Sequence, residues 1–244
     1  MTTIDQTKSY RVMGIRIMPL KSYINNKPVF FLAKRIFDIV MSTVVIVFLL
    51  SWFIPLLGIL IKLNSNGPIF FVQRRVGRGL KSFGCIKFRT MYLNGEKDAS
   101  KSDENDNRVT SIGRFLRITS LDELPQFINV LIGDMSIVGP RPHMFSDCNK
   151  FSGYIHDYKF RSIVRPGITG LAQVNGFRGP AEDSYNVTSR FYYDALYIRH
   201  MDARLDTKII FNTALQVLSI IFFKKNAEGR NYKRVKTKAK KIAA

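Results

Sequence analysis

The chain has 244 residues, with 38 Lys or Arg against 18 Asp or Glu, which gives a formal net charge of +20. Its hydrophobic fraction of 46% and its 19 Phe exclude a disordered protein, and its two cysteines are too few for a disulfide framework or a cysteine-ligated metal cluster. Residues 1–35 carry seven positive and one negative side chains, and residues 224–244 carry nine and one. We therefore expect one central domain over 33–223, a short basic extension over 1–32 and a polybasic tail over 224–244.

One apolar tract dominates the chain. The 23 residues 39–61 (IVMSTVVIVFLLSWFIPLLGILI) carry no charge. As one helix they would span about 35 Å, which is enough to cross a bilayer. The tract is too long and begins too late for a secretory signal peptide, and its length also disfavours a buried helix of a soluble core. The sequence thus predicts a membrane helix over about 36–62.

Charges on both sides of this tract bear on its topology. Basic residues precede and follow it, and the positive-inside rule assigns both flanks to the cytoplasm. Pro55 breaks an α-helix because it lacks an N–H and its ring clashes with the preceding turn. We therefore expect a re-entrant helix hairpin, with a hydroxyl of Ser51 or Thr43 bonding the freed carbonyls. A kinked helix that crosses the membrane once stays open as the alternative.

Two apolar-basic runs rich in Phe and β-branched residues follow the membrane tract, PIFFVQRRV and LKSFGCIKFRTM. They are separated by Gly77-Arg78-Gly79 and predict a β-hairpin with a glycine-bearing loop. The next segment, 94–107 (NGEKDASKSDENDN), is polar and aperiodic, and it predicts a loop.

Three helices are expected in the second half of the chain. PQFINVLI begins with Pro125, which suits a first helical position, and stops at Gly133, which predicts about two turns. Residues 181–199 and 207–223 are also expected to be helical. The last of these lies beside the basic tail, so we expect an amphipathic helix in the membrane interface, with a fully buried core helix as the alternative. The predicted fold class is α+β, mainly helical and membrane-associated.

An adjacent pair of carboxylates, Asp122 and Glu123, lies between basic segments. Guanidinium groups suit phosphate oxygens, which they bind bidentately. Those that flank the pair in sequence are Arg108, Arg114, Arg117 and Arg141. A capping box formed by Ser120 and Glu123 is the structural alternative. Pro125 argues against that helix start, so we expect the carboxylates in the turn just before the helix, where the helix dipole favours bound phosphate.

Six motifs occur in a fixed order: KRIFD (34–38), QRRVG (73–77), KFRTM (87–91), RVTSIGRFLR (108–117), SLDELPQFINVLIGDMSIVGPRP (120–142) and RPGITGLAQVNGFRG (165–179). Together they resemble the bacterial sugar transferases, the monotopic polyprenyl-phosphate phosphoglycosyl transferases, over residues 33–223. The resemblance implies transfer of a sugar-1-phosphate from a UDP-sugar to undecaprenyl phosphate, with Mg²⁺ and release of UMP, at the cytoplasmic face of the bacterial inner membrane. It also implies a re-entrant helix. The family often has Ser before the breaking proline, where this chain has Ile54.

Carried over by residue, the resemblance implies that Asp122 is the nucleophile, Glu123 its partner carboxylate and Arg141 a phosphate-binding arginine. A carboxylate that attacks the β-phosphorus of the donor splits the transfer into two steps. Because Mg²⁺ prefers carboxylate and phosphate oxygens, Asp122 and Glu123 are also its expected ligands. Direct attack by the lipid phosphate, with Asp122 as a base, stays open. The other expected substrate-binding residues are Arg117, Arg114, Arg108, Lys87 and Arg89, the last two with anionic lipid as an alternative ligand.

The expected donor is UDP-glucose or UDP-galactose, because the GPRPH and RPGITGLAQVNGFRG segments look closest to the hexose-1-phosphate branch that initiates exopolysaccharide or O-antigen synthesis. An N-acetylated amino-sugar donor is the alternative, and a membrane-tethered scaffold without activity is a further one. No nucleic-acid-binding module is visible, so the expected partners are the UDP-sugar, undecaprenyl phosphate and membrane lipids, with a homodimer left open. His143, His156 and His200 show no metal-ligand spacing, and we expect structural or surface roles for them.

Overall fold

The computed structural model describes residues 10–12, 15–17, 22, 26–93, 106–153, 155–178 and 184–222. Within them, helices alternate with three separate two-stranded sheets, so the fold is α+β and mostly helical, as predicted. The predicted polybasic tail, much of the predicted extension over 1–32 and most of the predicted loop over 94–107 lie outside the described residues.

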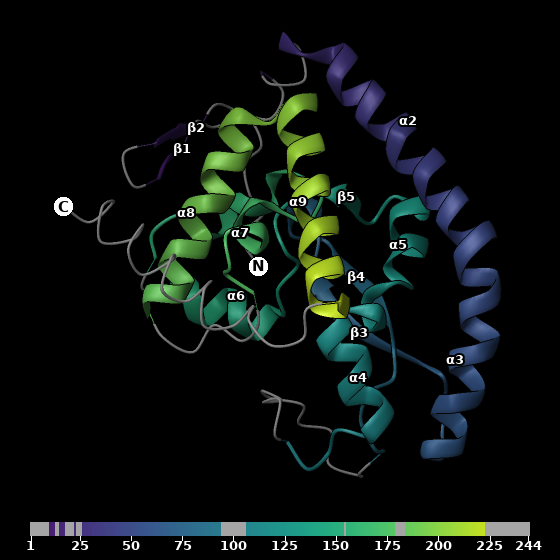
Figure 1. Cartoon of the computed structure of the whole chain (residues 1–244). Helices are drawn as coiled ribbons and strands as arrows, with labels where there is room; N and C mark the ends of the chain where they lie inside the picture. The colour runs from purple at the N-terminus through teal and green to yellow at the C-terminus, as the bar shows by residue number, and fades with distance from the viewer. Residues whose placement is uncertain are drawn as a thin grey trace.

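Most of the described chain forms short elements packed beside one long N-terminal helix (Figure 1). The helices after this one are α4 (Ser111–Thr119), α5 (Gln126–Ile132), α6 (Phe145–Ser152), α7 (Leu171–Val174), α8 (Ser184–His200) and α9 (Ala203–Phe222). The sheets pair β1 (Tyr10–Val12) with β2 (Ile15–Ile17), β3 (Phe70–Val76) with β4 (Ser82–Phe88), and β5 (Ser136–Val138) with β6 (Gly167–Thr169). Only the last pair is parallel. The three predicted helices of the second half are thus confirmed as α5, α8 and α9.

The N-terminal helix is continuous over 37 residues and is long and apolar enough to cross a membrane. It consists of α2 (Pro28–Val44), the π-helical η1 (Val45–Leu50) and α3 (Ser51–Asn64). Figure 1 shows that it runs along one side of the molecule and bends between α2 and α3. Large apolar side chains on it remain exposed, among them Phe48, Trp52 and Leu63 at 74%, 78% and 80%. Such a surface is suited to contact with lipid rather than water.

Pro55 does not end this helix, although the sequence predicts a break there. It lies inside α3, which continues to Asn64. The departure from α-helical hydrogen bonding is instead the π-helical η1, which ends at Leu50. Both π-helical turns and prolines bend helices. The hydroxyl of Ser51, one of the two predicted partners for freed carbonyls, donates to the carbonyl of Val47 at 2.5 Å.

Polar side chains of the KRIFD segment fasten α2 to the rest of the fold. Lys34 donates to the carbonyl of Val138 in β5 at 3.0 Å and forms an ion pair with Asp206 of α9 at 2.6 Å. Arg35 donates to two carbonyls at the end of α5, at 2.8 and 3.0 Å. Asp38 is buried and accepts from a backbone N–H of β5 at 3.0 Å. The start of the apolar helix is therefore bonded to the strand that leads into the GPRP segment.

The predicted β-hairpin is confirmed. Strands β3 and β4 pair in antiparallel register, and Phe70 stacks on Phe88 at 5.5 Å between ring centroids. The connecting loop contains a short 3₁₀ turn, η2 (Arg78–Leu80), in which Gly79 has φ +68°. This left-handed conformation carries little strain for glycine, which explains why the loop has one there.

The last helix, α9, packs one side on the core and leaves the other open. Ile209 is buried, while Phe211, Leu215 and Leu218 are 61%, 49% and 48% exposed. The alternative of a fully buried core helix is therefore wrong. The main hydrophobic core lies farther in, where α8, the 3₁₀ helix η4 (Tyr158–Ile163) and β5 contribute buried side chains. Cys85 and Cys148 are both buried and free.

Candidate active site

The two adjacent carboxylates occupy a short turn between two helices. Helix α4 ends at Thr119; the next residue, Ser120, has a left-handed φ of +58°, and the 3₁₀ turn η3 (Leu121–Glu123) follows. Pro125 then leads into α5. The side chain of Ser120 makes no capping hydrogen bond, so the alternative of a capping box is wrong and the predicted position in the turn before α5 is confirmed.

Glu123 is held by two cations. Arg141 donates to both of its carboxylate oxygens, at 3.1 and 2.7 Å, and Lys87 donates to one of them at 2.7 Å. Burial by itself raises the pKa of Glu123, but the charges and hydrogen bonds of Arg141 and Lys87 outweigh burial and hold the pKa well below its ordinary value. Glu123 is therefore ionised throughout the physiological range.

Asp122 has a different environment, although it is the next residue. It is 9% exposed, and its nearest cation is Lys87, with Nζ 4.0 Å from Oδ2. Within the part of the chain that the structure describes, no hydrogen bond to its carboxylate is found. The pKa of Asp122 is raised to about 6, mainly by burial and also by the negative charge of Glu123. The positive charges of Lys87, Arg141 and Arg117 act in the opposite direction but do not outweigh burial. The turn thus combines a locked carboxylate with one that keeps its oxygen lone pairs available.

The other predicted substrate-binding residues lie at different distances from this pair. Burial lowers the pKa of Arg117, and the nearby charge of Asp122 offsets this only in part. The Nε atom of Arg117 donates to Thr90 at 2.9 Å. Arg108 forms a bidentate contact with Asp106, at 3.0 Å from Nε and 2.7 Å from Nη2. Arg114 is exposed on α4.

Arg89 contacts the end of the membrane helix rather than the carboxylate pair. Its guanidinium is buried and donates to the carbonyls of Ser65, at 2.7 Å, and Asn66. These carbonyls follow directly after α3. The structure therefore gives Arg89 a role in fixing the point where the apolar helix ends, and among the predicted basic residues it brings Lys87, Arg141 and Arg117 together around the carboxylates.

Arg75 of β3 is a further member of the site that the sequence reasoning did not single out. Its Nη1 donates to the carbonyl of Pro142 at 3.3 Å, and its pKa is lowered by burial and then by the nearby charge of Arg141. Residue pairs across the hairpin place Arg75 on the face that also carries Lys87, because the register pairs Phe71 with Lys87 and residues two apart share a face. This alternation is the signal that identifies it.

Arg178 also approaches the site. Its pKa is lowered by burial and then by Arg141, while the charge of Glu123 raises it. Its Nη2 donates to Gln216 of α9 at 2.8 Å. Several guanidinium groups therefore converge near a single locked carboxylate, which leaves an excess of positive charge suited to a phosphate-bearing ligand.

A metal site built by the protein alone is not found in the described residues, since they contain no group of three or more His, Cys, Asp or Glu side chains that could hold an ion. Mg²⁺ usually takes only one or two protein carboxylates and completes its shell with phosphate and water oxygens. Asp122 fits such a ligand. Glu123 would first have to release a hydrogen bond from Lys87 or Arg141.

Comparison with known proteins gives a family match and several relatives. The family described as bacterial sugar transferase matches residues 29–220. The chain is 41% identical to a Klebsiella pneumoniae protein named UDP-glucose:undecaprenyl-phosphate glucose-1-phosphate transferase, over 87% of this chain and 46% of that protein. It is 40% identical to a UDP-N-acetylgalactosamine-undecaprenyl-phosphate N-acetylgalactosaminephosphotransferase of Aeromonas hydrophila, over 79% and 45%.

A third relative is similar in size to this chain. It is the exopolysaccharide production protein PSS of Rhizobium leguminosarum bv. phaseoli, 39% identical over 76% of this chain and 95% of that protein. The chain spans less than half the length of the other two relatives. The family match covers most of the chain and includes the carboxylate turn and its cations, and the protein therefore belongs to the bacterial sugar transferase family.

Proposed function

We propose that the protein transfers a hexose-1-phosphate from a UDP-sugar to undecaprenyl phosphate and releases UMP, as the first membrane step of exopolysaccharide or O-antigen synthesis. The observation that carries this proposal is the asymmetry of the carboxylate turn. Glu123 is locked between Arg141 and Lys87, while Asp122 is buried beside them without a hydrogen bond in the described structure. Membership of the sugar transferase family supports the reaction class.

Asp122 acts as the nucleophile in this proposal. One of its carboxylate oxygens forms a bond to the β-phosphorus of the donor, and the bond from that phosphorus to the bridging oxygen breaks, so that UMP leaves with the electron pair. An oxygen of undecaprenyl phosphate then attacks the same phosphorus and releases Asp122. With a pKa of about 6, the carboxyl group is mostly ionised at pH 7 to 8 and needs no base to attack.

Glu123 has a supporting role. By accepting hydrogen bonds from Lys87 and from both arms of the Arg141 fork, it orients these cations beside Asp122. Their other N–H groups are then available to the donor phosphates, where they stabilise the charge that develops during transfer. Mg²⁺ is the proposed cofactor, held by Asp122 together with the phosphates of the donor, and it would neutralise the pyrophosphate.

We further propose that the N-terminal helix is re-entrant and that the active site faces the cytoplasm at the inner membrane. The bend between α2 and α3, their exposed apolar surface and the basic residues on both flanks support this topology (Figure 1). The exposed apolar face of α9 would lie in the membrane interface. A single cysteine introduced at residue 26 should resist an impermeant thiol reagent in intact cells, as should one at residue 66. Labelling of one site alone from outside would establish a single crossing.

The donor is tested by UMP release. Purified protein, undecaprenyl phosphate and Mg²⁺ are incubated with UDP-glucose, UDP-galactose, UDP-N-acetylglucosamine or UDP-N-acetylgalactosamine. We expect turnover with one of the two hexose donors, and turnover only with an N-acetylated donor would refute the hexose assignment. Absence of UMP from every donor, in a protein that remains folded, would favour the scaffold alternative and refute the proposed function.

A further inference from the structure

The backbone of the segment that carries Arg141 is held by hydrogen bonds from other elements. Three consecutive carbonyls of the GPRPH segment each accept a hydrogen bond from another element. The carbonyl of Arg141 accepts from Arg161 Nη2 at 2.8 Å, that of Pro142 from Arg75 at 3.3 Å, and that of His143 from the N–H of Val76 at 2.9 Å. The backbone of residues 141–143 is therefore held by donors from η4 and β3, and these residues belong to no helix or strand themselves.

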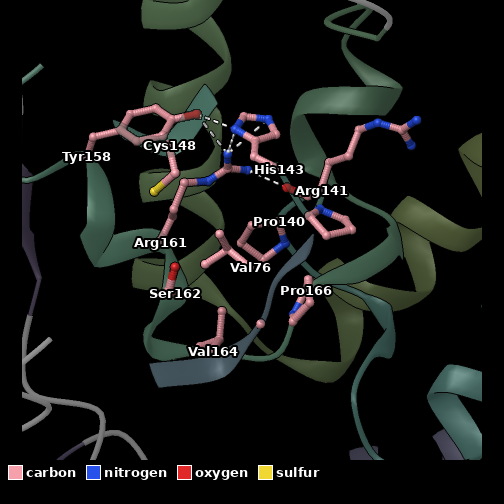
Figure 2. A pocket seen from close by; sticks show the side chains of 12 residues that line it. Val76, Pro140, Arg141, His143, Cys148, Tyr158, Arg161, Ser162, Val164 and Pro166 are labelled. Carbon is pink, nitrogen blue, oxygen red and sulfur yellow. Dashed lines mark hydrogen bonds between the residues drawn. The ribbon is translucent and has the colours of Figure 1, made fainter. Parts of the chain in front are cut away.

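Arg161 has several polar partners besides the carbonyl of Arg141. It belongs to η4 and is 6% exposed. The nitrogen that binds the Arg141 carbonyl, Nη2, also forms an ion pair with Asp194 of α8 at 2.6 Å. Its other terminal nitrogen lies 2.9 Å from the hydroxyl of Tyr158 and 2.5 Å from Nδ1 of His143. Figure 2 shows the side chains of Tyr158, His143 and Arg161 converging on one side of the Arg141 backbone, while the side chain of Arg141 points the opposite way.

Packing beneath this segment is incomplete. A cavity of about 20 Å³, room for roughly one water molecule, is bordered by Pro140, Arg141, His143 and Arg161 (Figure 2). The hydrogen bonds from Arg161 and Arg75 therefore hold a segment that side chains do not completely fill in on this side. A buried guanidinium is costly unless it is paired, which accounts for Asp194 in the core.

We propose that the Arg161–Asp194 ion pair is a positioning device for catalysis, which fixes the backbone of Arg141 so that its guanidinium meets both oxygens of Glu123. This inference rests on the proposed function, since it assigns a role in that reaction. The fork contacts Glu123 at 2.7 and 3.1 Å, so a backbone displacement of about 1 Å would break at least one of the two bonds. Arg161 acts only through Arg141 and does not touch the reacting atoms.

The test is a double-mutant cycle on full-length protein in detergent or nanodiscs. The charge-matched variant Arg161→Gln/Asp194→Asn removes one charge of each sign, so the net charge of the buried cluster, which also contains Arg190, is unchanged. It is combined with Arg141→Lys, which keeps a cation and the Arg141 carbonyl but loses the fork. We expect the charge-matched variant to lower kcat/KM about 10- to 100-fold in the wild-type background and less than threefold in the Arg141→Lys background.

A second readout is the acid limb of the pH profile of kcat/KM. Arg141 lowers the pKa of Asp122, so a displaced fork should move the limb to higher pH. The limb should move in Arg161→Gln/Asp194→Asn and should not move further when Arg141→Lys is added. If the double variant does not fold, Arg161→Lys replaces it in the same cycle, because lysine keeps the charge opposite Asp194 but has no planar fork. Tyr158→Phe is the matched control, because it removes a partner of Arg161 and leaves the contact with Arg141 in place.

Equal losses of activity in the wild-type and Arg141→Lys backgrounds, with an unmoved acid limb, would overturn the proposal and make the ion pair a purely structural element. A loss in Tyr158→Phe as large as in the charge-matched variant would also contradict it. The wild-type protein is assayed first. If it releases no UMP from any donor, the proposed function fails, whereas additive losses in a protein that turns over refute the positioning role alone.

Discussion

Replacing Asp122 with Asn should stabilise the protein while it removes activity. The buried carboxyl group is ionised at neutral pH against the preference of its surroundings, because burial raises its pKa from the ordinary 3.8 to about 6. One pKa unit corresponds to about 1.4 kcal/mol, so this rise represents about 3 kcal/mol of destabilisation at pH 8. Asp122→Asn removes the charge with little change of shape, and a gain of this order should raise Tm by roughly 6–12 °C for a chain of this size.

The gain should depend on pH in a defined direction. Above about pH 6 the folded protein carries the ionised carboxylate, so the penalty is fully present and the variant gains most. As pH falls through 6, the folded state takes up a proton that the unfolded state does not yet bind, and the wild type recovers stability. Below about pH 4 the carboxyl group is protonated in both states, and the difference between the two proteins should vanish.

The assay is thermal unfolding in detergent or nanodiscs at pH 8, 6 and 4.5, with Glu123→Gln as the matched control. Glu123 behaves in the opposite way, because Arg141 and Lys87 hold its pKa below the ordinary value and its ionised form stabilises the fold. Glu123→Gln should therefore lower Tm by a similar amount at all three pH values, because this loss begins to shrink only as pH falls below the ordinary glutamate pKa of about 4.5. A lower Tm for Asp122→Asn at pH 8, or a gain that is equal at pH 8 and 4.5, would refute the assigned environment of Asp122.

Three further predictions concern activity and the local fold. Arg141→Gln should reduce kcat/KM at least 100-fold, because it removes the bidentate partner of Glu123. Arg114→Gln, on the exposed face of α4, should change kcat/KM less than threefold. Similar losses for both variants would contradict the placement of Arg141 in the site and of Arg114 outside it. In the wild type, kcat/KM should fall below about pH 6 with one proton, and an unchanged rate at pH 5 would exclude Asp122 as an ionised nucleophile. Gly133 ends α5 at φ +100°, so Gly133→Ala should lower the free energy of unfolding by about 1 kcal/mol, and no change in Tm would show that the turn relaxes.

Local signals in the sequence predicted some of the elements that the structure contains, although not α4, α6 or the parallel pair of β5 and β6. Glycine in the loop predicted the β3–β4 hairpin, Pro125 and Gly133 bounded α5, and the uncharged tract predicted the long N-terminal helix. Pro125 also decided correctly between a capping box at Ser120 and a turn before α5, because a proline conflicts with a helix that begins at Ser120. These features depend on backbone chemistry within a few residues, and such chemistry is visible in sequence.

Contacts between distant segments were harder to predict. Six basic residues near the carboxylates in sequence or on the hairpin were expected to bind substrate. Of these, Arg89 instead binds carbonyls after α3, and Arg108 pairs with Asp106, which is only two residues away in sequence. Conversely, Arg75 was not singled out within the QRRVG segment, although strand alternation places it on the face of Lys87. Which guanidinium reaches an acceptor far away in sequence is decided by tertiary packing. The helix irregularity lies at η1 rather than at Pro55, where the sequence predicted it.

The central claim is that Asp122 forms a covalent bond to the sugar phosphate, and capture of that adduct tests it most directly. Wild-type protein is incubated with Mg²⁺ and the labelled UDP-hexose that supports turnover, without a lipid acceptor, then quenched, digested and mapped by mass spectrometry. We expect stoichiometric release of UMP and a hexose-phosphate adduct on Asp122, absent from Asp122→Asn and discharged when undecaprenyl phosphate is added before the quench. An adduct on Glu123 would reverse the two roles. UMP release that occurs only with the acceptor present, with no adduct on any residue, would contradict the covalent mechanism and favour direct attack by the lipid phosphate.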